Sequence, residues 1–565
     1  MERFINILII EPDPIIQNGL KEILAGGGNN VLIVNTLKKA IPLLEKREIG
    51  IFLVDINQVS DGASQFQMIR DNSIFKNNYI ILITREDQQG LRLVRGINEG
   101  AVDHIVYPFS PNLVRSKIEV FKSMFFKDQR IGQLLNNIFP ETILDELGNN
   151  SKFSPKRVDN GVVLFTDFVD FSLKAKKQKP LRLLQRLEKY FTRFDEIITK
   201  YNLEKIKTMG DAYMALSGVT ENKPKSAVRA CLAALEIREF MMKERDLARA
   251  MNREYWDIRI GLHMGPLVAG IIGSSKFSFD VWGDTVNIAA RAEAASKKGH
   301  ITITSSIQEQ VSKYMEATAR GPIEIHKRGG SIDMFYLEKL YPQYSLREEG
   351  VFANSLLRSI CDLPSMDFHQ MREHILNRLK SLLPEDITYH DLPHTLNVEK
   401  AAIRYAKLEG LTKEETYLIR TAALFHDAGF IQQYKDNEEY GANIAAATLP
   451  SFGYTDFQIS IIRKVIMSTR HDIEPETQLE KIMCDADHDY LGRPDYHDIA
   501  KKLRKEMADY GSSFNDLEWI DFQLEYLDKH HIFYTESANN IRLQGKNARI
   551  NELRERRTKM ISTTS

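Results

Sequence analysis

Two aspartates that end strand-like segments are the residues whose types and spacing most clearly suggest chemistry. The apolar run 162–165 ends at Asp167, and a second run turns through Gly210 into Asp211. Apolar runs bounded by a glycine turn indicate buried strands and a hairpin. If the strands are neighbours, both carboxylates lie at one end of a sheet, where they can bind hard divalent cations. Alternatively, each aspartate only closes a turn, because turns favour aspartate for local hydrogen bonding.

A third segment favours the metal-binding interpretation. It runs from Phe279 to Arg291 and contains Asp280, Asn287 and Arg291. With it, residues 155–340 resemble the class III nucleotidyl cyclases, since three segments match that family in order and at sensible separations. The resemblance implies a ferredoxin-like α+β domain whose catalytic site forms between two such domains. Because this chain carries both halves of the site, we expect a homodimer.

The resemblance also assigns roles to these residues. Asp167 and Asp211 would bind Mg²⁺ or Mn²⁺. Asn287 would orient the ribose, and Arg291 would stabilise charge as the 3′-oxygen attacks the α-phosphate, because a guanidinium fork matches phosphate oxygens. Without the rest of the segment, Arg291 would be interpreted as a surface ion-pair partner. Asp284 is expected to cap the helix that begins there.

Lys207 and Asp280 occupy the two positions that read the base in this family. Adenine presents an acceptor at N1 and a donor at N6, whereas guanine presents the reverse. A lysine only donates and an ionised aspartate only accepts, so the pair matches adenine. Lys205 is the alternative donor if the register differs. We therefore expect a phosphorus–oxygen lyase, an adenylate cyclase that converts ATP to 3′,5′-cyclic AMP and pyrophosphate by a two-metal mechanism.

The phosphate-binding segments depart from the family pattern. Backbone amides after Asp167, from Phe168 onward, are expected to contact the terminal phosphates, but Asp170 stands where the family usually has glycine. Lys327 and Arg328 resemble the basic phosphate-binding turn, although a glycine replaces the second lysine. An extra acid near a triphosphate is unfavourable unless it faces away, and this affects the expected rate more than the expected substrate.

Residues 1–122 alternate apolar runs with helical patterns, which predicts a doubly wound parallel α/β sheet. The expected strands are residues 4–10, 31–34, 51–54, 79–83 and 102–106. Acids follow some of these strands, at the carboxyl ends where such sheets bind ligands. The pattern resembles a response-regulator receiver domain, with Asp55 as the phosphoacceptor and Thr84 as the switch hydroxyl.

Two substitutions predict that this receiver is degenerate. Pro12 replaces one of the paired acids, and Tyr107 replaces the lysine that would pair with an aspartyl phosphate. Dimerisation or docking of a partner protein is therefore preferred over phosphorylation of Asp55 by an upstream phosphodonor. Residues 123–154 are expected to be a helical linker that forms a dimeric stalk, although most such apolar stripes simply face a core.

Residues 366–565, which follow a linker at 343–365, read as helical and carry recurring histidines and acids. Their order resembles that of the HD-type metal phosphohydrolases, an all-α fold, and the implied ligands are His394, His426, Asp427 and Asp487. Nitrogen and carboxylate donors suit Fe, Mn or Zn. A buried histidine is otherwise more often a satisfied core residue. Possible second-shell or second-metal groups, which could equally be solvated, are His390, His471 and Asp485.

Composition excludes several classes of protein. The 565 residues are 43% hydrophobic and 27% charged, which describes a globular, multidomain chain. A net charge of −1 argues against nucleic-acid or membrane partners, and three dispersed cysteines argue against a disulfide framework. A cytoplasmic location is therefore expected, with the cyclase domain at 155–342. Two rival functions remain: an HD phosphohydrolase or phosphodiesterase with a nucleotide-sensing cyclase domain, and a non-catalytic regulatory scaffold.

Overall fold

A computed structural model describes residues 3–61, 78–85, 96–97, 100–136, 139, 143–144, 146, 155–176, 179–218, 225–272, 278–324, 331–346 and 349–564. The chain divides into two compact units. Unit 1 combines residues 1–132 with 368–450 and 456–565, and unit 2 comprises residues 133–367 and 451–455. Among the helices of the described ranges, none is both long and apolar enough to cross a bilayer.

The amino-terminal part of unit 1 is a parallel sheet in the order β2-β1-β3-β4-β5. Its strands are β1 (Ile5–Ile10), β2 (Asn29–Val34), β3 (Ile51–Asp55), β4 (Tyr79–Arg85) and β5 (Asp103–Tyr107). The helices around it are α1 (Pro14–Leu24), α2 (Leu37–Leu44), α3 (Ile56–Asp61) and α6 (Pro111–Asn136). The predicted doubly wound fold is confirmed, because apolar side chains on both faces of the strands are buried.

Helix α6 joins the receiver sheet to the residues that follow it. The part of the helix up to Phe125 packs on the sheet through Val114, Ile118 and Phe125, which belong to the core of that domain. The helix then continues to Asn136, and its second half exposes Ile131 and Leu134. The predicted linker at 123–154 therefore begins inside a helix of the receiver part, and most of residues 137–154 lie outside the described residues.

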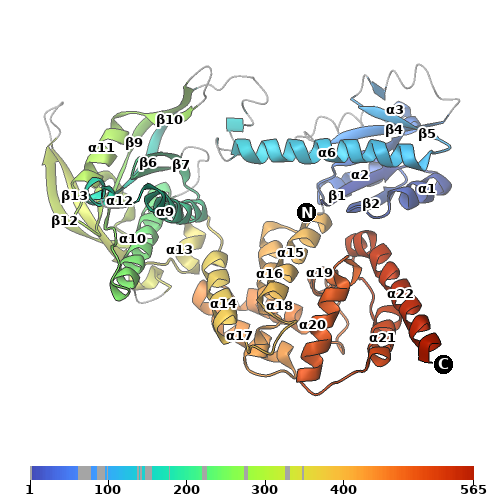
Figure 1. The fold of residues 1–565 in the computed structure, drawn as a ribbon. Coiled ribbons are helices and arrows are strands. Elements are labelled where there is room, and N and C mark those ends of the chain that lie inside the picture. The colour runs from blue at the N-terminus through green and yellow to red at the C-terminus, as the bar shows by residue number, and fades with distance from the viewer. Residues whose placement is uncertain are drawn as a thin grey trace. The chain divides into compact units, whose positions relative to one another are not determined.

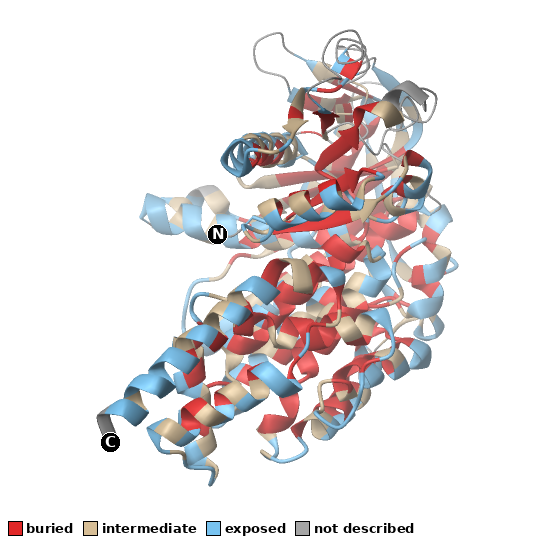
Figure 2. Ribbon diagram, turned by 90° about the vertical axis from the view of Figure 1, so that its right-hand side faces the viewer, coloured by how far each residue is buried: buried red, intermediate tan, exposed pale blue. Residues whose placement is uncertain are grey.

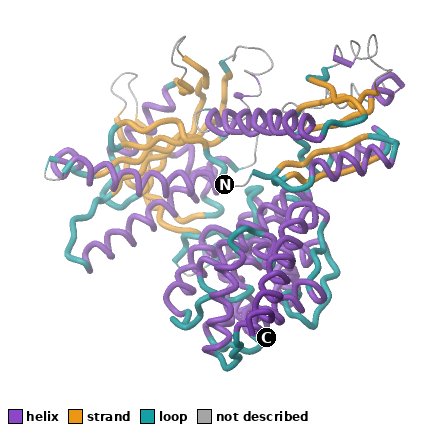
Figure 3. The backbone as a smooth tube through the Cα atoms, turned by 45° about the vertical axis from the view of Figure 1, so that its right-hand side comes forward, coloured by secondary structure: helices purple, strands orange, loops and turns teal. Residues whose placement is uncertain are grey.

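Residues 368–450 and 456–564 of unit 1 form helices and loops (Figure 3). The α-helices are α14 (Phe368–Leu382), α15 (Leu392–Glu409), α16 (Lys413–Phe425), α17 (Asn437–Thr448), α18 (Asp456–Met467), α19 (Gln478–Asp487), α20 (Tyr496–Asp509), α21 (Asp516–Glu525) and α22 (Glu536–Thr564). Shorter turns are η4 (Ala428–Ile431), η5 (Leu449–Phe452), η6 (Asp489–Gly492) and η7 (Tyr526–His530). Buried residues fill the inside of this bundle, whereas the last turns of α22 are exposed (Figure 2).

Unit 2 is built on a mixed sheet in the order β12-β13-β11-β9-β6-β8-β7, with β10 paired to β9 (Figure 1). The strands are β6 (Lys156–Phe168), β7 (Glu204–Met209), β8 (Ala212–Ser217), β9 (Ile258–Ile272), β10 (Ser278–Trp282), β11 (Ile301–Thr304), β12 (Met315–Glu324) and β13 (Ser331–Leu340). The helices are α8 (Phe171–Ala175), α9 (Pro180–Lys200), α10 (Ser226–Ala250), α11 (Asp284–Ala294), α12 (Ser305–Val311), η3 (Pro342–Tyr344) and α13 (Ser355–Ile360).

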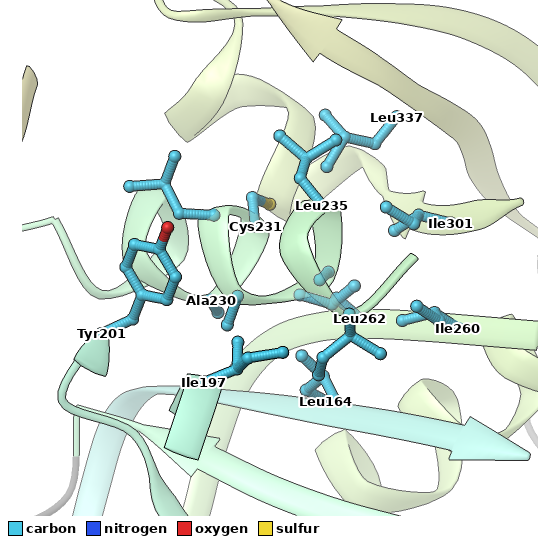
Figure 4. Packing of buried hydrophobic residues seen from close by; sticks show 14 of the residues in the cluster. Leu164, Ile197, Tyr201, Ala230, Cys231, Leu235, Ile260, Leu262, Ile301 and Leu337 are labelled. Atoms are coloured by element: carbon cyan, nitrogen blue, oxygen red, sulfur yellow. The ribbon is translucent and has the colours of Figure 1, made fainter. Parts of the chain in front are cut away.

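The apolar run of β6 is continuous because the sheet is covered on both faces. Val162 and Leu164 pack with α9 and α10, where Cys231 and Leu235 meet Leu262 of β9 (Figure 4). The alternate residues Val163 and Phe165 belong to a separate core cluster on the other side. Successive residues of a strand point to opposite faces, so each half of the run fills one core. This packing fixes the end of β6, where the first candidate residue lies.

Candidate functional site

Asp167 and Asp211 lie close together in unit 2. Asp167 is the penultimate residue of β6, and Asp211 is in the turn that joins β7 to β8, the strand that pairs with β6. Gly210 takes a φ of 66° in this turn, a conformation that glycine adopts at little cost. Burial and then the Asp167 carboxylate raise the pKa of Asp211 to about 6. A divalent cation between the two carboxylates would remove this repulsion.

Arg259 and Glu293 complete this cluster, and sequence reasoning missed both. Arg259 is the cross-strand partner of Asp167, and its Nη2 lies 2.6 Å from Asp167 Oδ2. On its other side, Arg259 Nε lies 3.0 Å from Glu293 Oε1 of α11. Helix α11 approaches β9 closely because Gly261 has no side chain: a Cβ there would lie 2.0 Å from the backbone nitrogen of Glu293. A charged residue inside the apolar strand sequence Ile-Arg-Ile-Gly-Leu was the available signal.

Lys207 and Asp280 are brought together by β7 and β10. Lys207 Nζ donates to Asp280 Oδ2 at 2.6 Å, and both side chains are partly exposed. The alternative donor, Lys205, instead pairs with Asp195 of α9 at 2.8 Å. A register shift in the pairing of β7 with β8 separates the two lysines. The structure therefore places one donor and one acceptor side by side at this edge, with Lys207 as the donor.

Asn287 and Arg291 lie one turn apart on α11, as their spacing predicts. Asn287 is exposed and Arg291 is half-buried. The expectation for Asp284 was wrong: Gly283 occupies the N-cap position, and Asp284 is the first residue of the helix. The physical reason is the φ of 147° at Gly283, which glycine tolerates, so that the chain turns into the helix one residue earlier. Asp284 still places a negative charge in the first turn.

The segment after Asp167 is more enclosed than its predicted role requires. The ring of Phe168 is buried among aromatic residues such as Trp256, 5.1 Å away, so only its backbone could contact a phosphate. The amide of Val169 already donates to the carbonyl of Asp257. Asp170 has a φ of 60° and accepts from Lys298 at 3.0 Å, which lowers the pKa of its carboxyl. Lys327 and Arg328 lie outside the described residues.

In the receiver part, Asp55 ends β3 and is buried, and Thr84 donates to the carbonyl of Ile105. Burial, with a smaller contribution from Asp55, raises the pKa of Glu11 to about 7, although the amide of Asp13 opposes the shift. Arg85 at the end of β4 lies 3.6 Å from Asp13. The receiver part therefore has an arginine near its acidic residues, although Tyr107 replaces the lysine that the family pattern predicts.

Four side chains converge in the helical part. His394 Nε2 lies 3.3 Å from Asp427 Oδ2 and 3.2 Å from Asp487 Oδ1, and His426 Nε2 lies 3.0 Å and 3.5 Å from the same two oxygens. The two imidazole nitrogens and Asp427 Oδ2 are buried without a well-formed hydrogen bond. Buried polar atoms rarely stay unsatisfied. A metal ion fits this donor set, because it would satisfy all of these atoms at once.

The surroundings of this cluster orient its histidines. His426 Nδ1 donates to the carbonyl of Ala423 at 2.9 Å, which leaves Nε2 as the donor atom toward a metal. Burial alone would lower the pKa of His394, but the adjacent carboxylates of Asp427 and Asp487 raise it to about 9. A cation would replace the proton that these carboxylates otherwise attract.

The further candidates near this cluster have different environments. His390 is bound to Glu506 and stacks on Phe430, so its ring is held from both sides. Asp485 is buried and accepts from the amides of Tyr534 and Thr535 at 2.8 Å. It therefore stabilises the loop before α22 and is not a solvated group. His471 is exposed.

Three segments of the chain match known families. Residues 7–119 match the response regulator receiver domain, residues 153–339 match the adenylate and guanylate cyclase catalytic domain, and residues 392–489 match the HD domain. The chain joins a receiver domain, a class III cyclase domain and an HD domain. The order and fold classes are those that the sequence predicts.

Relatives of the cyclase domain include both adenylate cyclases and guanylate cyclases. An adenylate cyclase of Mycobacterium bovis is 32% identical over 197 residues, which are 35% of this chain and 44% of that enzyme. The receptor-type guanylate cyclase gcy-23 of Caenorhabditis elegans is 29% identical over 214 residues, which are 37% of this chain and 20% of that protein. Among solved structures, the adenylyl cyclase CyaB from P. aeruginosa is 23% identical, with a TM-score of 0.32, and covers 34% of this chain and 100% of its own. The chain thus spans less than half the length of the two curated relatives named here.

Proposed function

We propose that the cyclase domain converts ATP to 3′,5′-cyclic AMP and pyrophosphate in a homodimer. The observation that supports adenine over guanine is the contact of 2.6 Å between Lys207 and Asp280. With Lys207 directed toward N1 and Asp280 toward the group on C6, the pair matches N1 and N6 of adenine, whereas guanine presents its N1–H donor and O6 acceptor in the reverse order. Lys207 and Asp280 already hold each other in place without a nucleotide. Little side-chain entropy is therefore lost when both bind a base instead of each other.

In this proposal Asp167 and Asp211 hold Mg²⁺ or Mn²⁺, which supplies positive charge at the ribose 3′-oxygen and the phosphates. Arg259 orients the Asp167 carboxylate, because its guanidinium donates to it at 2.6 Å. Asn287 and Arg291 of the partner subunit's equivalent helix would position the ribose and bind the α-phosphate. A domain on its own would have both half-sites but no complete site.

Purified full-length protein, incubated with ATP or GTP and Mn²⁺, tests the activity. Cyclic AMP from ATP, with GTP used at least about 100-fold less efficiently, is the expected product pattern. Cyclic GMP from GTP in equal yield would contradict the base assignment, and no cyclic product from either nucleotide would contradict the function.

Mixing two inactive variants tests the shared site. An Asp167→Ala chain and an Arg291→Ala chain should each be inactive, whereas their mixture should recover up to about a quarter of the wild-type activity, because random pairing leaves one intact site in half of the dimers. A mixture that stays as inactive as its components would exclude a site shared between subunits.

We also propose that the HD domain binds a transition metal and hydrolyses a phosphoester, because His394, His426, Asp427 and Asp487 converge on one point. The pocket beside these residues is lined by two cations, Arg493 and Lys502, which could bind a phosphate. Release of phosphate from a panel of nucleotides, lost in His426→Ala together with bound metal, would support the activity. Metal retention by that variant would exclude this ligand set.

A further inference from the structure

The receiver and HD domains contact one another although residues 133–367 separate them in the chain. Both belong to unit 1. The receiver contributes the amino-terminal ends of β1 and β2 and the segment after α2, and the HD domain contributes the end of α15 and the start of α22. Because Asp55 and Thr84 lie at the carboxyl ends of their parallel strands, this contact uses the opposite end of the sheet.

A buried ion pair forms the centre of the contact. Arg47 Nη2 lies 2.6 Å from Glu409 Oε2, with only 14% and 2% of the two side chains exposed. Glu409 Oε1 also accepts from the amide of Ser537 at 3.0 Å, so the carboxylate ties α15 to the start of α22. A buried carboxylate without its cation is costly, so Glu409 requires the receiver's arginine.

Two asparagines add specificity to the contact. Asn6 of β1 and Asn30 of β2 are 3% and 0% exposed. Asn540 of α22 donates to Asn30 Oδ1 at 2.6 Å and to the carbonyl of Val31 at 3.1 Å. Asn6 Oδ1 accepts from Asn30 Nδ2 at 2.8 Å, and Asn6 Nδ2 donates to the carbonyls of Glu48 at 2.8 Å and Leu408 at 3.5 Å. Buried amides of this kind define one docking geometry, because another would leave them unsatisfied.

A third set of contacts leads from the receiver to the candidate metal cluster. The guanidinium groups of Arg404 and Arg542 lie 4.5 Å and 5.4 Å from the ring centroid of Phe4. Both arginines bind Asp489, which is buried and also accepts from Tyr405 at 2.7 Å. Asp489 begins η6, two residues after Asp487. Phe4 of the receiver therefore contacts two arginines that bind Asp489. Asp489 in turn lies next to the candidate metal ligand Asp487.

We propose that the receiver is permanently docked on the HD domain and that this docking holds Asp487 in its metal-binding position. A change in the receiver would then act on the HD metal site through Phe4, the two arginines and Asp489. The partner predicted for this degenerate receiver is thus the HD domain of the same chain.

Mn²⁺ binding to full-length protein tests the proposal. All samples carry Asp167→Asn and Asp211→Asn, so that the metal reports on the HD site. Arg47→Glu places two carboxylates together, and Phe4→Leu removes the aromatic face while keeping apolar volume. We expect each to weaken Mn²⁺ binding by between about 3-fold and 30-fold, and to speed hydrogen exchange in β1, β2 and the start of α22.

Two variants serve as controls. Lys38→Glu makes the same charge change at an exposed position of α2, and Arg47→Lys keeps the charge; both should stay within about 2-fold of the parent protein. Unchanged exchange in Arg47→Glu would overturn the docking. Faster exchange with unchanged Mn²⁺ affinity in both Arg47→Glu and Phe4→Leu would overturn the coupling to the metal site, as would an equal loss in Lys38→Glu.

Discussion

Lys207 and Asp280 hold each other's side chains in place from neighbouring strands. Replacing Lys207 by Met keeps the length of the side chain but removes the donor and leaves Asp280 without its cation. We expect kcat/KM for ATP to fall by roughly 100-fold or more, because a site built to hydrogen-bond a base is penalised by each unpaired group. Lys205→Met is the matched control, since Lys205 pairs with Asp195 instead, and should retain activity. Equal losses in the two variants would contradict the assignment of Lys207.

Glu11 provides a test of pH dependence in the receiver. Burial raises its pKa to about 7 from an ordinary value of 4.5. The folded protein therefore keeps this proton to higher pH than the unfolded chain does, and the stabilisation that Glu11 gives below pH 4.5 is lost as pH rises to about 7.

Accordingly, Glu11→Gln should stabilise the receiver at pH 8 by about 1–3 kcal/mol and should have little effect at pH 4.5. Hydrogen exchange of the β1 and β3 amides in metal-free buffer measures this difference. Glu22→Gln, at an exposed position of α1, should change neither value. A Glu11→Gln effect of the same size at both pH values would show that packing, and not ionisation, is responsible.

The sequence alone indicated the residues whose chemical role follows from their residue type and their spacing. Asp167, Asp211 and the HD histidines stand at the ends of recognisable apolar runs, so their convergence could be expected. Arg259 was missed because its importance depends on pairing register: it matters only because β9 places it opposite Asp167. Glu293 was missed for the same reason, since its contact depends on how closely α11 approaches the sheet.

At the scale of elements, the approach of α11 to β9 depends on one glycine. A Cβ at Gly261 would lie 2.0 Å from the backbone of Glu293, which cannot yield as a side chain could. Gly261→Ala should destabilise unit 2 by roughly 1–3 kcal/mol and should reduce cyclase activity, because Arg259 loses its second carboxylate. Thermal unfolding and ATP turnover measure the two effects.

Gly19 is the matched control for this substitution. It lies within α1 with open space where a Cβ would stand, so Gly19→Ala should be neutral or stabilise by up to about 1 kcal/mol. If Gly261→Ala unfolded at the wild-type temperature, the close approach of helix and strand would be contradicted.

The elements themselves were largely predictable, because their apolar patterns have the periods of strands and helices. The five receiver strands and the apolar run of β6 follow directly from such patterns. The helix α6 was harder to divide, since its first half is core and its second half is exposed, and no turn residue marks the change. The N-terminus of α11 was placed one residue late because Asp284 is a good cap, while the backbone at Gly283 decides the turn.

At the scale of the whole molecule, unit 1 is assembled from three stretches of chain, residues 1–132, 368–450 and 456–565. Its contact includes a buried ion pair and buried asparagines, which are specific enough to form between separate fragments. We therefore expect a fragment of residues 1–136 and one of residues 362–565 to copurify when they are expressed together. Size-exclusion chromatography of the tagged pair measures this association. The same pair with Arg47→Glu should separate, and independent elution of the wild-type fragments would contradict a single folded body.

Unit 1 is discontinuous in the sequence, and this affects which domains such a chain can gain or lose in evolution. Residues 133–367 enter from unit 1 and return to it, so they are an insertion within another folded body. Insertions whose two ends connect to the same host can be exchanged, shortened or removed without cutting the host's core. A different domain could occupy this position while the surrounding receiver and HD domains stayed the same.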